Sequence, residues 1–265
     1  MLRKQTPARR ASDPDYMLSL ARGLQVIRAF GRERPVLTIA EVARLTSMSR
    51  AAARRCLHTL GVLGYVAGDG GRYALAPRVL ALGHAYLGSA PVAQAAQPVL
   101  ERVAERLHES CSLAVLDADE IVYVARAATR RIMAVGLAVG SRLPAYCTSM
   151  GRVLLAFASD AERSAYLRRV KPVRHTPHTT VGRRALAAEL SRVRSAGYAI
   201  VDQELELGLR SMAVPVRRPD QAVVAAMNVG VHAARVESET LRREYLPVLL
   251  EAAEEVGLAL AHRLS

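Results

Sequence analysis

The sequence predicts an α+β chain in two parts, a helical part followed by a part that mixes helices with strands. In residues 16–76, apolar residues recur every three to four positions, the period of a helix, before a glycine-rich turn. In residues 91–265, short apolar strands are grouped between helices instead of alternating strictly with them, which favours an antiparallel sheet. We expect residues 77–90 to form a linker helix and residues 1–15 to be a disordered basic tail.

The excess of basic over acidic residues is concentrated in the first third of the chain. The 265 residues include 37 Lys and Arg against 24 Asp and Glu, and residues 1–88 hold 14 of the basic and 5 of the acidic ones. A compact basic domain is the electrostatic footprint of a protein that binds a polyanion. All the basic residues except Lys4 and Lys171 are arginines, which fit phosphates and guanine edges. A codon bias toward arginine is an equally simple explanation of that preference.

Several classes of protein are excluded by what the sequence lacks. No window reaches the roughly 18–20 uninterrupted apolar residues of a membrane span. The basic N-terminus has no apolar core after it, so we expect a cytoplasmic protein without a secretory leader and without a membrane partner. Cys56, Cys111 and Cys147 are far apart, which argues against a disulfide framework and against a thiolate zinc site.

The basic third has the order of elements of a winged helix-turn-helix. A first helix is predicted over Ser19–Phe30. Thr38 and Glu41 have the spacing of a capping box and open a second helix, and after a short turn Ser49 caps a third helix over 50–63. Two short helices joined by a tight turn form the helix-turn-helix pattern. One departure is that the turn contains a serine, at position 47, where glycine is usual.

The third helix and the hairpin after it supply the expected DNA contacts. The apolar stripe of the helix is Ala53, Cys56, Leu57 and Leu60, which leaves its basic side chains facing outward. Two short strands around Gly68–Gly71 predict a hairpin, the wing, with Arg72 directed at phosphate or at the minor groove. The alternative is a helical hairpin and a strand pair with a solvated basic face. The predicted DNA-binding residues are Thr38, Ser49, Arg50, Ala51, Arg54, Arg55, His58 and Arg72.

The remaining elements follow from periodicity. A linker helix begins at Pro77, and an amphipathic helix over 93–107 is expected to be interrupted at Pro98. A long C-terminal helix over 238–264 is expected to kink near Pro247. Between them, hairpins are predicted from strands 112–116 with 121–126 and 131–137 with 142–146, then helices 150–157, 160–170 and 185–196, and strands 198–201, 212–215 and 222–231.

The chain resembles the IclR family of bacterial transcription regulators over about residues 17–263. The motifs that carry the resemblance are Ser19-Leu-x-Arg-Gly-Leu24, Thr38-Ile-Ala-Glu-Val-Ala43, Leu143-Pro-Ala-Tyr-Cys-Thr-Ser-Met-Gly151, Gly208-Leu-Arg-Ser211 and Asn228-Val-Gly230. The stretch 143–151 is most similar to the branch that controls protocatechuate and 4-hydroxybenzoate degradation. The resemblance implies homodimers or dimers of dimers on an operator in double-stranded DNA. It also implies a GAF-like domain that senses a small carboxylate effector.

The candidate effector site is centred on a strand-to-helix junction. The N-terminus of the helix that follows Tyr146 offers free N–H groups and the positive end of a dipole to a carboxylate; an ordinary buried cap is the alternative. Arg126 and Arg210 could clamp that carboxylate, or pair at the surface. Asp202 and Glu204 match the family's acidic signature and could accept hydrogen bonds from the ring hydroxyls of an effector. The full predicted set is Arg126, Tyr146, Thr148, Ser149, Met150, Gly151, Asp202, Glu204, Arg210, Ser211 and Asn228; the last two face the same cavity in the family.

No catalytic or cofactor motif is recognised. The stretch around Ser149 lacks the first glycine of G-x-S-x-G, and no phosphate-binding glycine loop is present. His175 and His178 are a close pair without a third ligand, so neither a metal nor a cofactor is expected. We therefore expect a DNA-binding regulator controlled by an aromatic acid. The alternatives are a regulator that senses an aliphatic carboxylate such as glyoxylate or pyruvate, an enzyme with a GAF-like domain, and an architectural DNA binder without a ligand.

Overall fold

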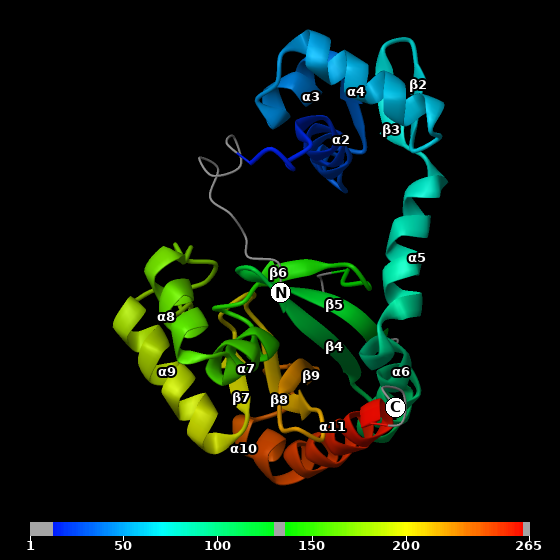
Figure 1. Ribbon diagram of the computed structural model, residues 1–265. Coiled ribbons are helices and arrows are strands. Elements are labelled where there is room, and N and C mark those ends of the chain that lie inside the picture. Colours follow the sequence, from blue (N-terminus) through cyan, green and yellow to red (C-terminus); the bar gives the residue numbers. More distant parts are fainter. Residues whose placement is uncertain (1–12, 130–135, 262–265) are drawn as a thin grey trace. The chain divides into compact units, whose positions relative to one another are not determined.

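The computed structural model describes residues 13–129 and 136–261, so most of the expected disordered tail lies outside the described residues. The chain divides after Ala85 into two compact units. Helices and strands combine in an α+β architecture, as predicted (Figure 1). Within the described ranges, no helix has both the length and the apolar character needed to cross a bilayer.

The first unit is a winged helix-turn-helix. Its elements are α2 (Leu18–Ala29), β1 (Val36–Thr38), α3 (Ile39–Thr46), α4 (Arg50–Val62), β2 (Val66–Asp69) and β3 (Arg72–Leu75). Val26, Val42 and Leu57 are almost completely buried where the three helices meet. Both predicted caps are confirmed: Thr38 and Glu41 form a reciprocal capping box, and the Ser49 hydroxyl accepts the Ala52 N–H. The turn residue Ser47 adopts the left-handed conformation, with φ 54°.

The wing contains one strand more than the sequence predicted. β1 pairs antiparallel with β3, so that Thr38 lies opposite Arg72 and the sheet order is β1-β3-β2. Three residues are too few to show strand alternation, and Thr38 already had a role as a helix cap. At the tip, Gly70 and Gly71 both have positive φ, which a two-residue hairpin turn of this kind requires.

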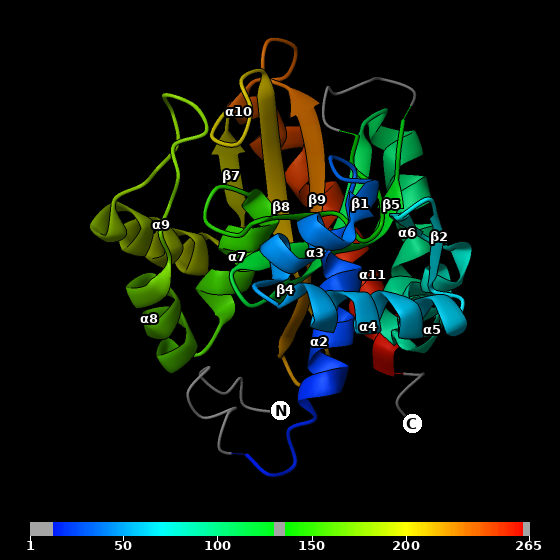
Figure 2. The same ribbon diagram turned by 90° about the horizontal axis from the view of Figure 1, so that it is seen from above.

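The second unit is a six-stranded antiparallel sheet between two helical layers. The strands, in the order β6-β5-β4-β9-β8-β7, are β4 (Ser110–Asp117), β5 (Glu120–Ala127), β6 (Arg142–Pro144), β7 (Ala199–Asp202), β8 (Leu209–Arg217) and β9 (Val223–His232). Helices α6 (Pro91–Leu107) and α11 (Leu246–Ala261) cover one face. The core of the other face is closed by α7 (Ser149–Phe157), α8 (Asp160–Arg169) and α9 (Arg183–Ala196), as Figure 2 shows from above.

Three predictions about single elements need correction or comment. α6 runs through Pro98 without interruption, because Ala95, Ala96 and Val99 around it are buried and their burial offsets the lost hydrogen bond. β6 pairs with β5, not with the strand expected at 131–137, most of which lies outside the described residues. Before α11, the π-helical turn Leu241–Tyr245 follows α10 (Ser238–Thr240), whereas the kink expected near Pro247 stays a prediction.

The connection between the parts is helical. The 3₁₀ turn Pro77–Val79 continues into α5 (Leu80–Ser89), so a helix lies where the linker was expected. Arg78 donates to the Leu63 carbonyl oxygen at 2.6 Å and anchors this turn to the end of α4. No residue of α5 is buried within the chain.

Candidate functional site

The outward face of α4 presents a row of basic side chains. Arg50, Arg54 and His58 are spaced four residues apart, so they lie above one another on one face of the helix, and all three are exposed. Ala51 and Arg55 form the neighbouring row and are exposed as well. The short Ala51 leaves the backbone accessible between the arginines. The predicted DNA-contact residues of α4 are therefore exposed on the surface, and their insertion into a major groove remains a prediction.

A groove runs between α4 and the wing. Arg54 and His58 line its helix side, and Gly68 and Tyr73 line its strand side. A Cβ at Gly68 would lie 2.7 Å from the Tyr73 ring, so a larger residue there would require the Tyr73 side chain to shift. Arg72 is exposed at the start of β3. The structure therefore brings α4 and the wing together on one basic surface.

Two of the predicted DNA contacts have their hydroxyls in caps. Thr38 Oγ1 donates to a Glu41 carboxylate oxygen at 2.8 Å and accepts the Glu41 N–H. The Thr38 backbone N–H also donates to the Glu41 carboxylate. This hydrogen bond, followed by the one from the Thr38 hydroxyl, lowers the pKa of Glu41 from its ordinary value of 4.5. Ser49 Oγ is engaged with the Ala52 N–H at 3.2 Å. Contacts of Thr38 and Ser49 with DNA remain predictions.

The second unit contains a cavity between the sheet and the N-terminus of α7. Strand register explains which side chains reach it: Ser112 lies opposite both Arg126 and Asn228, and the next row on the same face places Ser110 and Ser211 opposite Gly230. These polar residues line the cavity from β5, β4, β9 and β8. The rest of the lining is mostly apolar: Tyr123, Leu137, Leu143, Cys147, Met150, Val201, Leu205 and Leu209.

Three buried polar atoms at this cavity have no partner among the described residues. They are Arg126 Nε, Ser149 Oγ and Asn228 Oδ1. Arg126 Nη1 donates to Ser112 Oγ at 2.9 Å, which holds the guanidinium beside the strand while its Nε stays unused. Leaving a buried polar group unsatisfied costs about 1–3 kcal/mol. Such a cluster in one apolar cavity indicates a ligand that supplies the missing partners.

The first turn of α7 supplies the positive end of a helix. Thr148 is the N-cap; its Oγ1 accepts the Gly151 N–H and donates to the Pro144 carbonyl oxygen at 3.0 Å. The N–H groups of Ser149 and Met150 precede the first intrahelical bond and have no acceptor within the helix. A Cβ at Gly151 would overlap the Ala145 carbonyl oxygen, so glycine is needed for α7 to pack this closely against the segment that contains Ala145.

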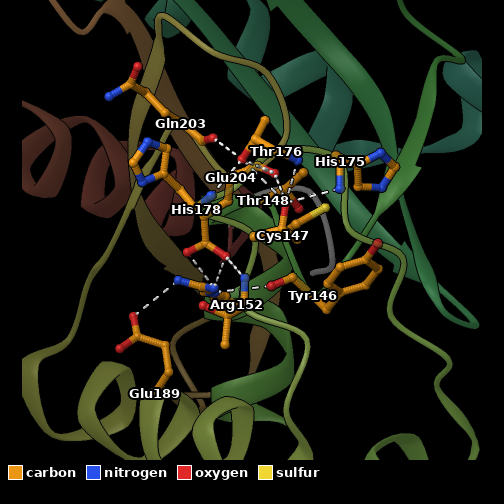
Figure 3. Close-up of polar contacts among 12 residues, drawn as sticks. Tyr146, Cys147, Thr148, Arg152, His175, Thr176, His178, Glu189, Gln203 and Glu204 are labelled. Carbon is orange, nitrogen blue, oxygen red and sulfur yellow. Dashed lines mark hydrogen bonds and ion pairs between the residues drawn. The ribbon is translucent and has the colours of Figure 1, made fainter.

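A buried ion pair holds the segments that flank the cavity (Figure 3). Arg152, only 3% exposed, pairs with Glu204 at 2.6 Å and donates from Nε to the Tyr146 carbonyl oxygen at 3.1 Å. Glu204 also accepts the Thr180 N–H at 2.8 Å. Its neighbour Leu205 lines the cavity. Arg152 could not be singled out from the sequence, because a lone arginine inside an apolar helix has no distinguishing pattern.

The structure brings together only part of the predicted effector set. Arg126, Thr148, Ser149, Met150, Ser211 and Asn228 line the cavity, whereas Tyr146, Gly151, Asp202, Glu204 and Arg210 are not among its lining residues. Asp202 and Arg210 form an ion pair of 2.8 Å with each other, and the Tyr146 hydroxyl donates to the Val173 carbonyl oxygen at 2.8 Å. Their role in effector binding remains a prediction.

Sequence reasoning missed lining residues that alternation could have revealed. Ser110 and Ser112 alternate along an otherwise apolar strand, so they had to share one face with Arg126 and Asn228 once the strands were paired. Tyr123 and Cys147 were hidden among apolar neighbours. Burial raises the pKa of each of these two groups to about 12, so both are neutral in the folded protein at pH 7.

A winged helix-turn-helix joined to a sheet domain with a partly polar internal cavity defines a ligand-responsive DNA-binding regulator. Comparison with known families makes this assignment specific. The IclR helix-turn-helix domain matches residues 19–70, and the bacterial transcriptional regulator IclR C-terminal domain matches residues 84–258. The chain belongs to the IclR family of bacterial transcriptional regulators, as the resemblance predicted, and it binds DNA.

Relatives narrow the similarity further. The chain is 49% identical over 256 residues to the Pca regulon regulatory protein of Pseudomonas putida, covering 95% of this chain and 88% of that one. It is 36% identical over 247 residues to the p-hydroxybenzoate hydroxylase transcriptional activator of Acinetobacter baylyi, covering 91% of each. An IclR homologue of Microbacterium hydrocarbonoxydans, solved in complex with 4-hydroxybenzoate, superposes with a TM-score of 0.78 at 28% identity, covering 93% of this chain and all of that one.

Proposed function

We propose that this regulator reads its operator with α4 and the wing, and that a small aromatic carboxylate in the cavity of the second unit controls that binding. The N-terminus of α7 and the Arg126 guanidinium receive the carboxylate. The apolar walls hold the ring, and Asn228 and Ser211 are placed for a ring hydroxyl. The names of the relatives and the 4-hydroxybenzoate of the structural neighbour support this effector class.

The unsatisfied atoms Arg126 Nε, Ser149 Oγ and Asn228 Oδ1 are the observation that carries the proposal. An anion with two oxygens satisfies the first two, and a hydroxyl donates to the third. Burial raises the pKa of the Cys147 thiol to about 12, so this thiol is a poor nucleophile at pH 7. In the described part of the chain, no group of three or more His, Cys, Asp or Glu could hold a metal.

A thermal-shift series tests the effector class. A ligand at 100 times its Kd stabilises a protein by about 2.7 kcal/mol, which is easily measured. We expect 4-hydroxybenzoate and protocatechuate to stabilise the chain more than cyclohexanecarboxylate, glyoxylate or pyruvate. If glyoxylate or pyruvate stabilises it and both aromatic acids fail, the sensor is for aliphatic acids.

Variants then place the ligand. Ser149→Ala removes a buried hydroxyl without a partner, so the apoprotein keeps its stability while effector affinity falls about 10- to 100-fold, the value of a hydrogen bond to a charged group. Ser191→Ala, on the exposed side of α9, is the matched control and leaves both quantities unchanged. Unchanged effector affinity in the Ser149 variant places the carboxylate elsewhere.

The active form proposed here is a homodimer that binds two half-sites. Leu20 and Leu24 of α2 and Leu80 of α5 are exposed, and an apolar groove of the first unit is lined by α2, α4 and Leu82. A second copy that covers these side chains would place two recognition helices on one duplex, about 34–36 Å apart or a multiple of that. Sedimentation of the Leu20→Glu variant tests this proposal, and we expect monomers. If the variant is still a dimer, the dimer interface lies on another surface. The same runs separate a dimer from a dimer of dimers.

A further inference from the structure

A second basic surface lies on the effector-binding unit. Residues 168–184, from the last turn of α8 to the first turn of α9, contain six basic residues and no acidic one. They are Arg168, Arg169, Lys171, Arg174, Arg183 and Arg184, and all are exposed. Arg183 donates to the Arg168 carbonyl oxygen at 3.3 Å, and α8 and α9 lie side by side in both views (Figures 1 and 2), so the two ends of this segment lie next to each other.

These six residues differ from the other arginines of the same unit. All other arginines that the structure describes after Ala85, except Arg126 in the cavity and Arg217 over the Phe157 ring, form an ion pair with a carboxylate. Of the six, only Arg169 does so, with Asp119. Codon bias toward arginine explains their number, but not why carboxylate partners are missing here when most other described arginines of the same unit have one.

The surface also lacks what a protein partner would need. The core of a protein interface is depleted of charge and rich in apolar and aromatic side chains. Among the large hydrophobic side chains of residues 168–184, only Val173 is exposed. Exposed arginines at high density without carboxylates are instead suited to phosphates along a nucleic acid backbone.

We propose that this surface, residues 168–184 of the effector-binding unit, is a second contact with duplex DNA, made to the phosphates that flank the operator. It carries no base readout, since the contacts are with the backbone. Binding by the winged helices tethers the flanking duplex to the same protein as this surface, and tethering raises the effective concentration of a second contact, so weak contacts can add to the total affinity. The proposal does not depend on the identity of the effector.

The test compares two duplexes and two triple variants. The operator, recovered by selection of random-sequence duplexes with the full-length protein, is prepared trimmed to the winged-helix footprint and with about 30 extra base pairs on each side. The surface variant is Arg168→Gln/Lys171→Gln/Arg184→Gln, whose three side chains have no hydrogen bond or ion pair within the described residues. Arg102→Gln/Arg106→Gln/Arg243→Gln removes the same charge from exposed ion pairs and is the control.

We expect the surface variant to bind the long duplex with a salt slope, log K against log of salt concentration, lower by about 2.7 per protomer, and up to about 100-fold more weakly at 0.15 M salt. It binds the trimmed duplex as the control does. Equal affinity and slope for both triple variants on the long duplex overturn the proposal. Normal DNA binding with lost transcription by purified RNA polymerase also overturns it, in favour of an acidic protein partner.

Discussion

The arginines of the two units are used in different ways. In the first unit, none of the described arginines forms an ion pair with a carboxylate, although Glu33, Glu41 and Asp69 are present. In the second unit most arginines are paired, from the buried Arg152–Glu204 pair to exposed pairs such as Arg102–Glu255. The same residue type therefore stabilises one unit and leaves the other with a free positive surface.

The pairing of the arginines distinguishes a contribution to DNA binding from a contribution to folding, which net charge alone cannot do. An unpaired exposed arginine contributes little to folding, and its charge remains available to a polyanion. A paired arginine is neutralised locally, and removing one partner of a buried pair costs more stability than removing one partner of an exposed pair. It follows that substitutions of exposed, unpaired arginines in the first unit should change DNA affinity at constant stability, and that substitutions of buried pairs in the second unit should do the reverse.

The largest expected effect is on the buried pair. Arg152→Gln leaves Glu204 buried and uncompensated, so we expect the second unit to lose about 3–5 kcal/mol of stability, measured by calorimetry of the full chain. The melting transition of the first unit should not move. A change below 1 kcal/mol would show that paired arginines in this chain do not support its fold.

A double variant sharpens this result. Replacing both partners, as Arg152→Met with Glu204→Leu, removes the charges together and should restore most of the stability. The Tyr146 carbonyl oxygen then loses the Arg152 Nε–H, so part of the loss remains. A double variant as unstable as the single one would mean that packing, and not the ion pair, is responsible.

Arg54 is the counterpart in the first unit. Arg54→Ala should weaken operator binding by about 1–3 kcal/mol, with discrimination lost at one base pair and the melting temperature unchanged, because the side chain is exposed and unpaired. Arg54→Lys keeps the charge without the planar fork, so it should retain the salt slope while losing specificity. Competition binding against single-base operator variants measures both effects. A large loss of stability in either variant would contradict the division between the units.

Most of the first unit could be predicted, because its signals are local. The Thr38–Glu41 capping box, the Ser49 cap and the Gly70–Gly71 turn each fix a boundary within four residues of sequence. The strand β1 was missed because its evidence is its pairing with β3, more than thirty residues away in the chain.

The effector cavity was harder to predict because it is assembled by strand register. Arg126 and Asn228 meet through Ser112, on a strand that lies between theirs, and no local pattern shows that order. Only the N-terminus of α7 had a local signal, the cap at Thr148. The partner of the acidic signature could not be predicted either, since the Glu204 carboxylate pairs with Arg152 and Glu204 is not among the residues that line the cavity.

Since the described arginines of the first unit form no ion pair with a carboxylate, the caps of its helices should matter more for its stability. Thr38→Ala should cost about 1 kcal/mol, seen as faster hydrogen exchange of the α3 amides. The pKa of Glu41 is lowered in the folded state, so its stabilising effect is present above its ordinary pKa of 4.5 and is lost as the pH falls below that value. We expect α3 to become less protected on acidification, and Glu41→Gln to flatten this dependence. A variant with an unchanged pH profile would exclude the capping box as the cause.

The smallest expected effect has the opposite sign and lies in the turn between α3 and α4. Ser47 adopts φ 54°, a conformation that costs little for glycine but is strained for residues with a Cβ. Ser47→Gly should relieve this strain, partly offset by the greater freedom of glycine in the unfolded chain, and raise the stability of the first unit by about 0.5 kcal/mol. Because Ser47 is exposed and its substitution changes no charge, operator affinity and its salt slope should stay constant.

Gln203→Gly, at φ 58° in the second unit, is a control for positive φ. There the Gln203 side chain accepts the Gly208 N–H at 3.0 Å, so the substitution to glycine should destabilise the second unit. If both substitutions stabilise equally, backbone conformation alone determines the change in stability. The side-chain contacts of the second unit would then contribute less to its stability than the comparison of the two units implies.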